Sequence, residues 1–227
     1  MTIKPGLVIF GTSNILSDLV DCAQANGQFV TRIVTHLAEQ SGERDLTLAD
    51  RLPAWAALGQ TPSVEPLENF TPHPGEAYLL GPTTPARAAL ADLVVERFGL
   101  SFTTLIHPSA AVSPLSSLGP GCFVGAGSAV GPGADLAGHV FVNRGVTIGH
   151  DTKIGADSRI QPGSNVGGRC RIGHGVTIGI GATVIERIHI GDHGFVGAGS
   201  VVTKDVEAET MVFGVPAKFL KSVTREG

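Results

Sequence analysis

One short stretch of the sequence combines residue types suited to acid–base chemistry. Residues 143–155 read NRGVTIGHDTKIG, in which His150 is followed directly by Asp151. An imidazole titrates near neutral pH, and an adjacent carboxylate can orient the ring and raise its basicity. The pair therefore predicts a general base. The neighbouring histidines are expected to be solvated surface residues; they are His139, His174, His189 and His193.

Two turns in the first hundred residues have the composition of ligand-contacting segments. Residues 11–15 read GTSNI after an apolar run, but they lack the second and third glycines that let a backbone approach a phosphate. This pattern fits a structural turn as well as a ligand cradle. Further on, Thr83, Thr84 and Arg87 precede a predicted helix, where they would either hold a phosphate at its N-terminus or simply cap it.

The elements that position the His-Asp pair come from a repeat of period six. Every sixth residue from Val112 to Val202 is Leu, Ile or Val, and the position four residues after each of them is small or β-branched from Ser116 to Val206. Period six matches neither a helix nor an ordinary strand, and it is the hexapeptide signature of a parallel β-helix. Three hexads make one triangular coil, so residues 18 apart stack at about the 4.8 Å strand spacing. We expect a little over five coils between residues 111 and 206.

The first half of the chain has a different pattern. Apolar runs at residues 6–11, 28–34 and 101–106 and at Tyr78-Leu79-Leu80 predict strands, and helical periodicity follows the first run and spans 85–98. Residues 41–75 are expected to be mostly loop around a short helix near Trp55. This order predicts a small Rossmann-like parallel α/β sheet whose ligands bind at the carboxyl ends of its strands. The predicted domains are residues 1–106 and 107–227.

Composition excludes several classes of protein. The chain has 227 residues, a net charge of −4 and 42% hydrophobic residues, which argues against disorder and against a nucleic-acid-binding surface. No apolar run is long enough for a signal peptide or a membrane span, so we expect a cytoplasmic protein. The three cysteines are Cys22, Cys122 and Cys170, and their spacing predicts free buried thiols.

Several segments together resemble a known family. They are Ile106-His107-Pro108-Ser109-Ala110, residues 143–155, Pro162-Gly163, residues 197–202 and Gly214-Val215-Pro216-Ala217-Lys218. This combination, after a small α/β domain, resembles the bacterial hexapeptide-repeat sugar acyltransferases, and most closely the sialic-acid O-acetyltransferase and UDP-4-amino-sugar N-acetyltransferase group. The resemblance implies a homotrimer of left-handed parallel β-helices. It also implies acetyl-CoA between neighbouring subunits, no metal, and a nucleotide-sugar acceptor held by the first domain.

The resemblance also implies roles for particular residues. His150 would take a proton from the attacking amine or hydroxyl, Asp151 would tune it, and Asn143 would lie near the sugar. The other matching positions are Thr12, Ser13 and Asn14 for the substrate and Gly168, Ile180 and Ala198 for acetyl-CoA.

The chain departs from the family pattern at the segments that contact the nucleotide. Arg159 replaces a second histidine, and it would pair with a CoA phosphate or with an acidic substrate. Thr35-His36 replaces an acidic pair, and the turn at 11–15 lacks the family's glycines.

Two alternatives to an acetyltransferase use the same scaffold. One is a non-catalytic β-helical ligand-binding or scaffold protein. The other is a zinc enzyme like the β-helical carbonic anhydrases, for which His150, His189 and His193 are the nearest candidate ligands. The sequence leaves open which acceptor is used, whether N- or O-transfer occurs, and whether the donor is acetyl or a longer acyl group.

Overall fold

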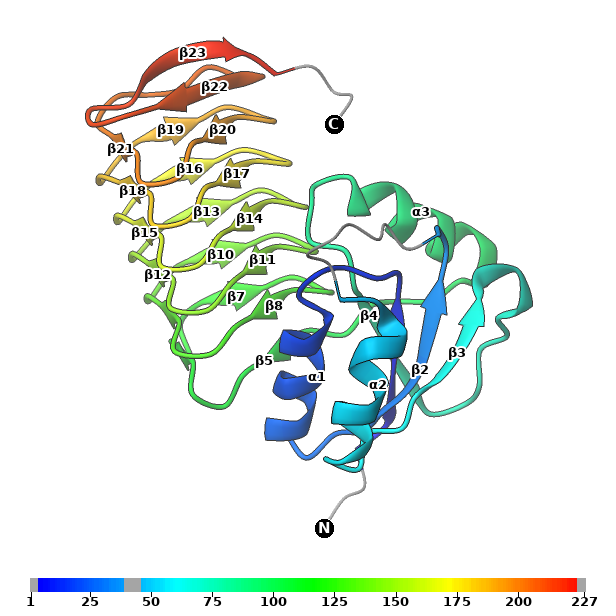
Figure 1. Cartoon of the computed structure of the whole chain (residues 1–227). Coiled ribbons are helices and arrows are strands. Elements are labelled where there is room, and N and C mark those ends of the chain that lie inside the picture. Colours follow the sequence, from blue (N-terminus) through cyan, green and yellow to red (C-terminus); the bar gives the residue numbers. More distant parts are fainter. Residues whose placement is uncertain (1–3, 39–45, 224–227) are drawn as a thin grey trace.

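The computed structural model describes residues 4–38 and 46–223. A small α/β layer packs against the side of a tall prism of stacked coils, and the C-terminal strand closes the far end of the prism (Figure 1). Within the described residues, no helix is long and apolar enough to cross a membrane.

The α/β layer is a four-stranded parallel sheet in the order β3-β2-β1-β4. Its strands are β1 (Gly6–Phe10), β2 (Val30–Thr35), β3 (Ser63–Pro66) and β4 (Glu76–Leu80). Its helices are α1 (Leu16–Ala25), α2 (Leu48–Ala56) and α3 (Arg87–Phe98), with a short 3-10 turn η1 (Leu67–Asn69). The chain order reverses between β1 and β4, which is the switch point where parallel sheets of this kind open a crevice at their carboxyl ends.

Two details of this layer differ from the sequence-based expectation. The segment 41–75 contains an additional edge strand, β3, as well as the expected helix; residues 41–45 lie outside the described part of the chain. Pro66 ends β3 at the edge of the sheet, where no further strand needs its missing N–H. The strand expected at 101–106 is reduced to an isolated bridge at Phe102 and to β5 (Leu105–Ile106), which pairs with the prism.

The prism consists of two-residue strands in three sheets. The eight-stranded sheet holds β5, β8 (Phe123–Val124), β11 (Phe141–Val142), β14 (Arg159–Ile160), β17 (Thr177–Ile178), β20 (Phe195–Val196), β22 (Thr210–Phe213) and β23 (Lys218–Ser222). The six-stranded sheet holds β6 (Ala111–Val112), β9 (Ala129–Val130), β12 (Thr147–Ile148), β15 (Asn165–Val166), β18 (Thr183–Val184) and β21 (Val201–Val202). The five-stranded sheet holds β7 (Ser117–Leu118), β10 (Asp135–Leu136), β13 (Lys153–Ile154), β16 (Arg171–Ile172) and β19 (His189–Ile190).

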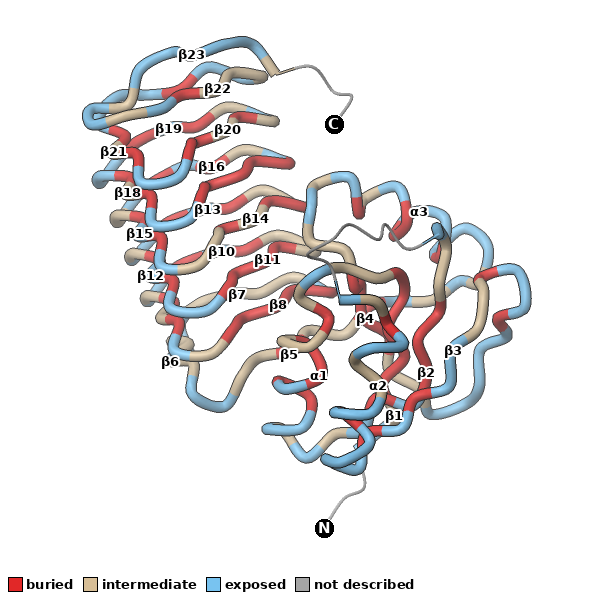
Figure 2. Tube along the Cα trace, viewed as in Figure 1, coloured by how far each residue is buried: buried red, intermediate tan, exposed pale blue. Residues whose placement is uncertain are grey.

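The pairing register confirms the parallel β-helix. Phe141 lies beside Phe123 below and Arg159 above, each 18 residues away. The Leu/Ile/Val column is buried from Val124 to Val202, and it forms a continuous core along the axis of the prism (Figure 2). Val112 and Leu118, at the first coil, are only partly covered because no full coil lies beneath them.

Polar members of the second column link successive coils. The Ser158 hydroxyl donates to the Gly173 carbonyl at 2.8 Å and accepts from the Val176 amide at 2.9 Å. The thiols of Cys122 and Cys170 occupy equivalent positions and contact carbonyl oxygens at 3.1 Å. All three cysteines are free and buried, as predicted. Burial raises the pKa of Cys22 to about 12 and that of Cys122 to about 11.

The corners of the prism use a left-handed backbone at every sixth residue from Gly121 to Gly199. Glycine takes eight of these positions, because it adopts positive φ without steric cost. The six others are His139, Asp151, Asp157, Arg169, Arg187 and His193, with φ between 56° and 62°. Asp151 therefore lies at a conformationally demanding corner, although Asp and His tolerate this region better than most residues.

The α/β layer covers the eight-stranded sheet. Phe123 and Phe141 of that sheet stack with ring centroids 4.8 Å apart and join the core beneath α1. On one side Arg144 pairs with Asp18 of α1. On the other side Arg87 of α3 donates to the backbone carbonyls of two adjoining coils, as described below. The two parts of the chain thus share apolar packing and polar contacts.

Candidate functional site

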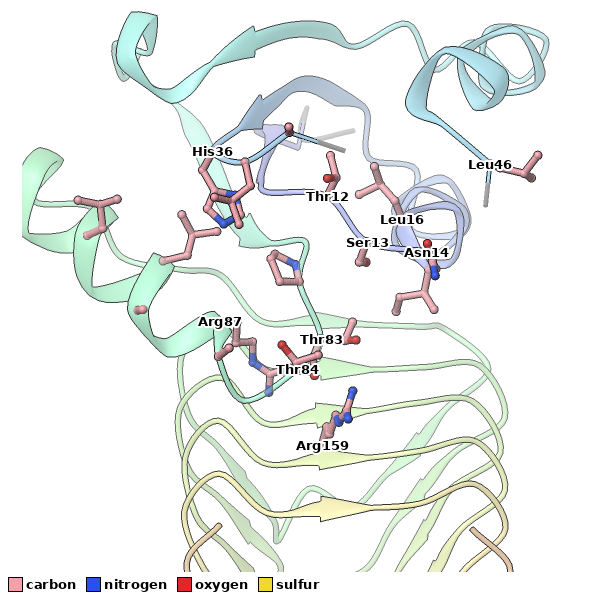
Figure 3. Close-up of a pocket in the computed structure, with 18 of the residues that line it drawn as sticks. Thr12, Ser13, Asn14, Leu16, His36, Leu46, Thr83, Thr84, Arg87 and Arg159 are labelled. Carbon is pink, nitrogen blue, oxygen red and sulfur yellow. Dashed lines mark hydrogen bonds between the residues drawn. The ribbon is translucent and has the colours of Figure 1, made fainter. Parts of the chain in front are cut away.

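A cleft of about 730 Å³ opens at the carboxyl ends of the parallel strands, between the α/β layer and the prism. Figure 3 shows His36 and Thr12 at one end and Arg159 of the prism at the other, with Thr83 and Thr84 between them. Each of β1, β2 and β4 contributes the residues that follow it, and α3 and β14 complete the walls. The cleft therefore lies at the carboxyl ends of the strands, where ligand binding was predicted, and at the switch point that the observed strand order creates.

The turn after β1 both shapes the sheet and lines the cleft. Thr12, Ser13 and Asn14 all face the cavity. The Ser13 hydroxyl donates to the Gly81 carbonyl at 2.8 Å, which ties this turn to the turn after β4. A Cβ at Gly81 would lie 2.1 Å from the Gly11 carbonyl oxygen, so the two turns approach too closely for another residue. The turn at 11–15 is therefore a structural turn that also forms part of the cleft wall.

The start of α3 carries no side-chain cap. Its N-cap position is Ala86, and no side chain there accepts from the first-turn amides. Thr83 and Thr84 line the cleft instead of capping the helix, so capping does not explain their presence. The amides of the first turn donate instead to the backbone carbonyls of Thr84, Pro85 and Ala86.

Arg87 is the deepest charged residue at this cleft, with 3% of its surface exposed. One terminal nitrogen donates to Thr83 at 3.0 Å, and the other donates to the carbonyls of His139 and, at 3.1 Å, Ser158. Burial lowers the pKa of Arg87 to about 10, with the nearby charge of Arg159 as a weaker cause in the same direction and Asp157 opposing both. Arg87 therefore stays charged at neutral pH.

Two buried polar atoms at the cleft lack a hydrogen-bond partner among the described residues. They are Nδ1 of His36 and Nε of Arg87. Burial lowers the pKa of His36, so its ring is neutral at pH 7. Because buried polar groups are normally paired, these two atoms are exceptions at the cleft.

His150 and Asp151 form the hydrogen-bonded pair that their adjacency predicts. His150 Nδ1 lies 2.8 Å from an Asp151 carboxylate oxygen, and Arg169 approaches the same oxygen at 4.0 Å. A carboxylate accepts from Nδ1–H, which leaves Nε2 as the proton acceptor. The His150 ring lies against Gly168 of the next coil, where a Cβ would be 2.7 Å from Nε2. Glycine at 168 thus makes room for the imidazole.

The residues predicted to bind acetyl-CoA lie at two corners of the prism, one of which carries His150. Gly168 lies one coil above His150, and Ala198 lies one coil above Ile180 at the next corner of the prism. Within the described part of the chain the backbone amides of Gly168, Ile180 and Ala198 donate no hydrogen bond. They are therefore available to a ligand's carbonyl or amide groups, and their assignment to acetyl-CoA stays a prediction.

Asn143 lies apart from the cleft predicted to hold the sugar, and Arg159 lies apart from the corners predicted to hold acetyl-CoA. Asn143 is 5% exposed, holds the Arg144 amide at 2.8 Å and lines a separate cavity of about 110 Å³ beside α1, apart from the cleft. Arg159 lies in the cleft with Thr12, away from the corners that carry Gly168 and Ile180.

The His-Asp pair and the cleft lie on opposite sides of a single chain. The cleft covers the eight-stranded sheet, through Arg159 of β14. His150 lies at the corner between the six- and five-stranded sheets, which is the corner opposite that sheet in a triangular coil. One chain therefore does not bring His150 to the cleft.

The three histidines considered as zinc ligands are spread over the prism. His150 and His193 are at different corners and His189 is on the five-stranded sheet. Over residues 4–38 and 46–223, no three His, Cys, Asp or Glu side chains gather in a metal-binding arrangement.

Sequence reasoning gave too little weight to Arg51 and His36. Arg51 of α2 reaches the cleft and donates to Ser17 at 2.8 Å and to the Asn14 carbonyl at 3.1 Å. His36 directly follows β2, and a residue at that place in a switch-point sheet commonly contacts the ligand. The position of His36 just after a predicted strand could have indicated a ligand contact. Nothing in the sequence pattern linked Arg51 to Asn14.

Comparisons with known proteins agree with this architecture. A family model described as the hexapeptide repeat of succinyl-transferase matches residues 145–180 and 171–204. A serine acetyltransferase from Buchnera aphidicola subsp. Acyrthosiphon pisum (strain APS) is 29% identical over 141 residues, which are 61% of this chain and 46% of that protein. The chain thus spans less than half the length of this curated relative.

Solved structures resemble the chain over nearly its whole length. The acetyltransferase domain of PglB from Neisseria gonorrhoeae FA1090 has a TM-score of 0.80 and 26% identity, covering 96% of this chain and 100% of that domain. PerB from Caulobacter crescentus, solved with CoA and GDP-perosamine, has a TM-score of 0.78 and 28% identity, covering 95% and 97%. The fold is that of the hexapeptide-repeat acyltransferases, a small parallel α/β domain followed by a β-helix. The resemblance to the sugar acyltransferases is thereby confirmed.

Proposed function

We propose that the chain transfers an acetyl group from acetyl-CoA to an amino or hydroxyl group of a sugar, most simply the amino group of a nucleotide-linked sugar. The observation that carries the proposal is the His150–Asp151 pair on a β-helix, next to Gly168, whose backbone amide donates no hydrogen bond among the described residues. The PglB domain has also been solved with acetyl-CoA, and PerB with CoA and a nucleotide-linked sugar, which supports the same pair of substrates here.

In this proposal the chain's own residues act on the acceptor. Asp151 holds the Nδ1–H of His150, so that Nε2 takes the proton as the amine attacks the thioester carbonyl. The carbon–nitrogen bond forms as the carbon–sulfur bond breaks, and the proton passes to the departing thiolate. Backbone amides of the corners that include Gly168 supply donors for the developing negative charge on the carbonyl oxygen.

The opposed positions of the base and the cleft favour a site shared between copies of the chain. The side chains of His150 and Asp151 are 51% and 59% exposed, so one chain leaves the pair in water. A second copy placed against that corner would exclude water and bring its own cleft to His150. We therefore propose a homotrimer in which each site combines the base of one chain with the acceptor cleft of another.

Thiol release from acetyl-CoA in the presence of UDP-, GDP- and dTDP-linked amino sugars tests the activity. We expect turnover with at least one of them. Turnover with none, together with no binding of acetyl-CoA in a thermal-shift measurement, would favour a non-catalytic ligand-binding protein.

Mixed oligomers test the shared site. His150→Ala removes the base and Ala86→Trp blocks the cleft, and each variant alone is expected to be inactive. Co-expressed chains would restore part of the activity if the base and cleft come from different copies. Mixtures that stay inactive, although mass spectrometry shows that mixed oligomers form, would contradict this arrangement.

A further inference from the structure

The end of the cleft next to the prism is lined by positive charge, and the carboxylate of Asp157, which acts on Arg87, does not line the cleft. Among the described residues that line the cleft, three are arginines and none is Asp or Glu. Arg51, at the far end, is already bonded to Ser17 and to the Asn14 carbonyl. The remaining two, Arg87 and Arg159, approach each other at the floor of the cleft (Figure 3).

Arg159 keeps a free guanidinium edge. Its Nε donates to the Thr177 hydroxyl at 3.0 Å, which fixes the side chain along the eight-stranded sheet. No carboxylate of the described residues forms an ion pair with it, and burial lowers its pKa because the charge is partly removed from water. Its two terminal nitrogens remain as a planar pair of donors, the geometry that matches a carboxylate or a phosphate.

Further donors without a partner belong to residues that line the cleft beside Arg159. Arg87 is 97% buried, and its Nε has no partner among the described residues. The hydroxyls of Thr83 and Thr84 donate no hydrogen bond in the described part of the chain, and both residues line the cleft. The first-turn amides of α3, a helix of 12 residues, already donate to carbonyls of the preceding turn, so the helix contributes only the positive end of its dipole.

We propose that Arg159, Arg87 Nε and Thr83-Thr84 form a subsite for an oxyanion of the acceptor. This inference rests on the proposed function to the extent that the cleft holds the acceptor. The anion is either a carboxylate on the sugar or a phosphate attached to it, since both present paired oxygens. Arg159 is then a specificity-determining residue for the acceptor, because it lies beneath the α/β layer rather than beside Ile180 and Ala198 at the prism corners.

Binding of simple probes without a nucleotide tests the subsite. Glucose, glucose 1-phosphate and glucuronate are titrated into the full chain, and binding is measured by ligand-observed NMR. We expect one or both anions to bind more tightly than glucose. In R159Q that anion should lose about tenfold to a hundredfold in affinity, the size expected for a charge-assisted pair of hydrogen bonds. The anion that responds identifies the source of the oxyanion.

Two further variants make the result specific. R159K keeps the charge but loses the planar fork, so its affinity should fall between those of the wild type and R159Q. R171Q makes the same chemical change at an exposed arginine of the five-stranded sheet and should bind like the wild type. Equal melting temperatures of R159Q and the wild type would show that the fold is intact.

The proposal is overturned if R159Q binds both anions as the wild type does. It is also overturned if R159Q loses affinity for acetyl-CoA while keeping affinity for the anions, since Arg159 would then serve the donor. The probes contain no acetyl group. If anions bind through Arg159 but no thiol is released under any condition, the proposed function is refuted and the subsite stands. If sugars are acetylated but R159Q binds the anions as the wild type does, only the subsite is refuted.

Discussion

Strand pairing within the prism and strand pairing within the α/β layer join residues at very different sequence separations. In the prism each strand pairs with strands one coil away, as Ile172 does with Ile154 and Ile190. In the α/β layer Leu7 lies between Val30 and Ala77, with no constant offset. The difference teaches that a repeat carries its own register, whereas an ordinary sheet takes its register from contacts that no local pattern specifies.

The strongest test of this comparison is a charge in the repeated core. Ile172→Asp places a carboxylate in a column where the native side chain is 4% exposed. We expect a loss of more than about 4 kcal/mol in the free energy of unfolding, and hence no soluble folded protein, because the aliphatic contacts are lost and a polar group is buried. Circular dichroism and size-exclusion chromatography measure the outcome.

Ile180→Asp provides the matched control for folding. Ile180 is 60% exposed at a corner, so the same substitution there should leave the protein folded. Cooperative melting of the Ile172→Asp protein near the wild-type temperature would show that the column assignment is wrong.

The next largest expected effect is on kcat, through His150 in the β-helix. His150→Ala should lower kcat by about 10²- to 10⁴-fold, the usual contribution of a general base. The variant should stay folded because its ring is half exposed at a corner. Steady-state thiol release with the accepted sugar measures kcat. His189→Ala, an exposed histidine of the same prism, should retain wild-type kcat, and near wild-type turnover of His150→Ala would remove His150 from the mechanism.

The smallest expected effect lies in the α/β layer, at His36. Burial lowers its pKa in the folded chain, so the unfolded chain binds a proton first as the pH falls through about 6.5. This group therefore contributes stability above the unfolded pKa that is lost at lower pH. His36→Gln should lose less stability between pH 7.5 and pH 5.5 than the wild type, measured by urea denaturation. An equal loss in both proteins would contradict a depressed pKa.

The sequence was a good guide to the site where the chemistry depends on neighbours in the chain. His150 and Asp151 are adjacent, and their hydrogen bond follows from one corner. The cleft was predicted only as an edge of a sheet. Arg159 of β14 and Thr83, which follows β4, both line the cleft although they come from different parts of the fold. No spacing in the sequence relates the two residues.

The sequence by itself determined the β-helix, its core columns, its free buried thiols and the His-Asp pair. These depend on offsets of one, six or 18 residues, which the repeat fixes through backbone hydrogen bonds between coils. Only the tertiary structure decided that β3 joins the sheet, that Arg159 faces the α/β layer, and that His150 lies opposite the cleft. The physical reason is that these relations depend on packing between segments with no fixed sequence offset, and packing joins surfaces rather than sequence neighbours.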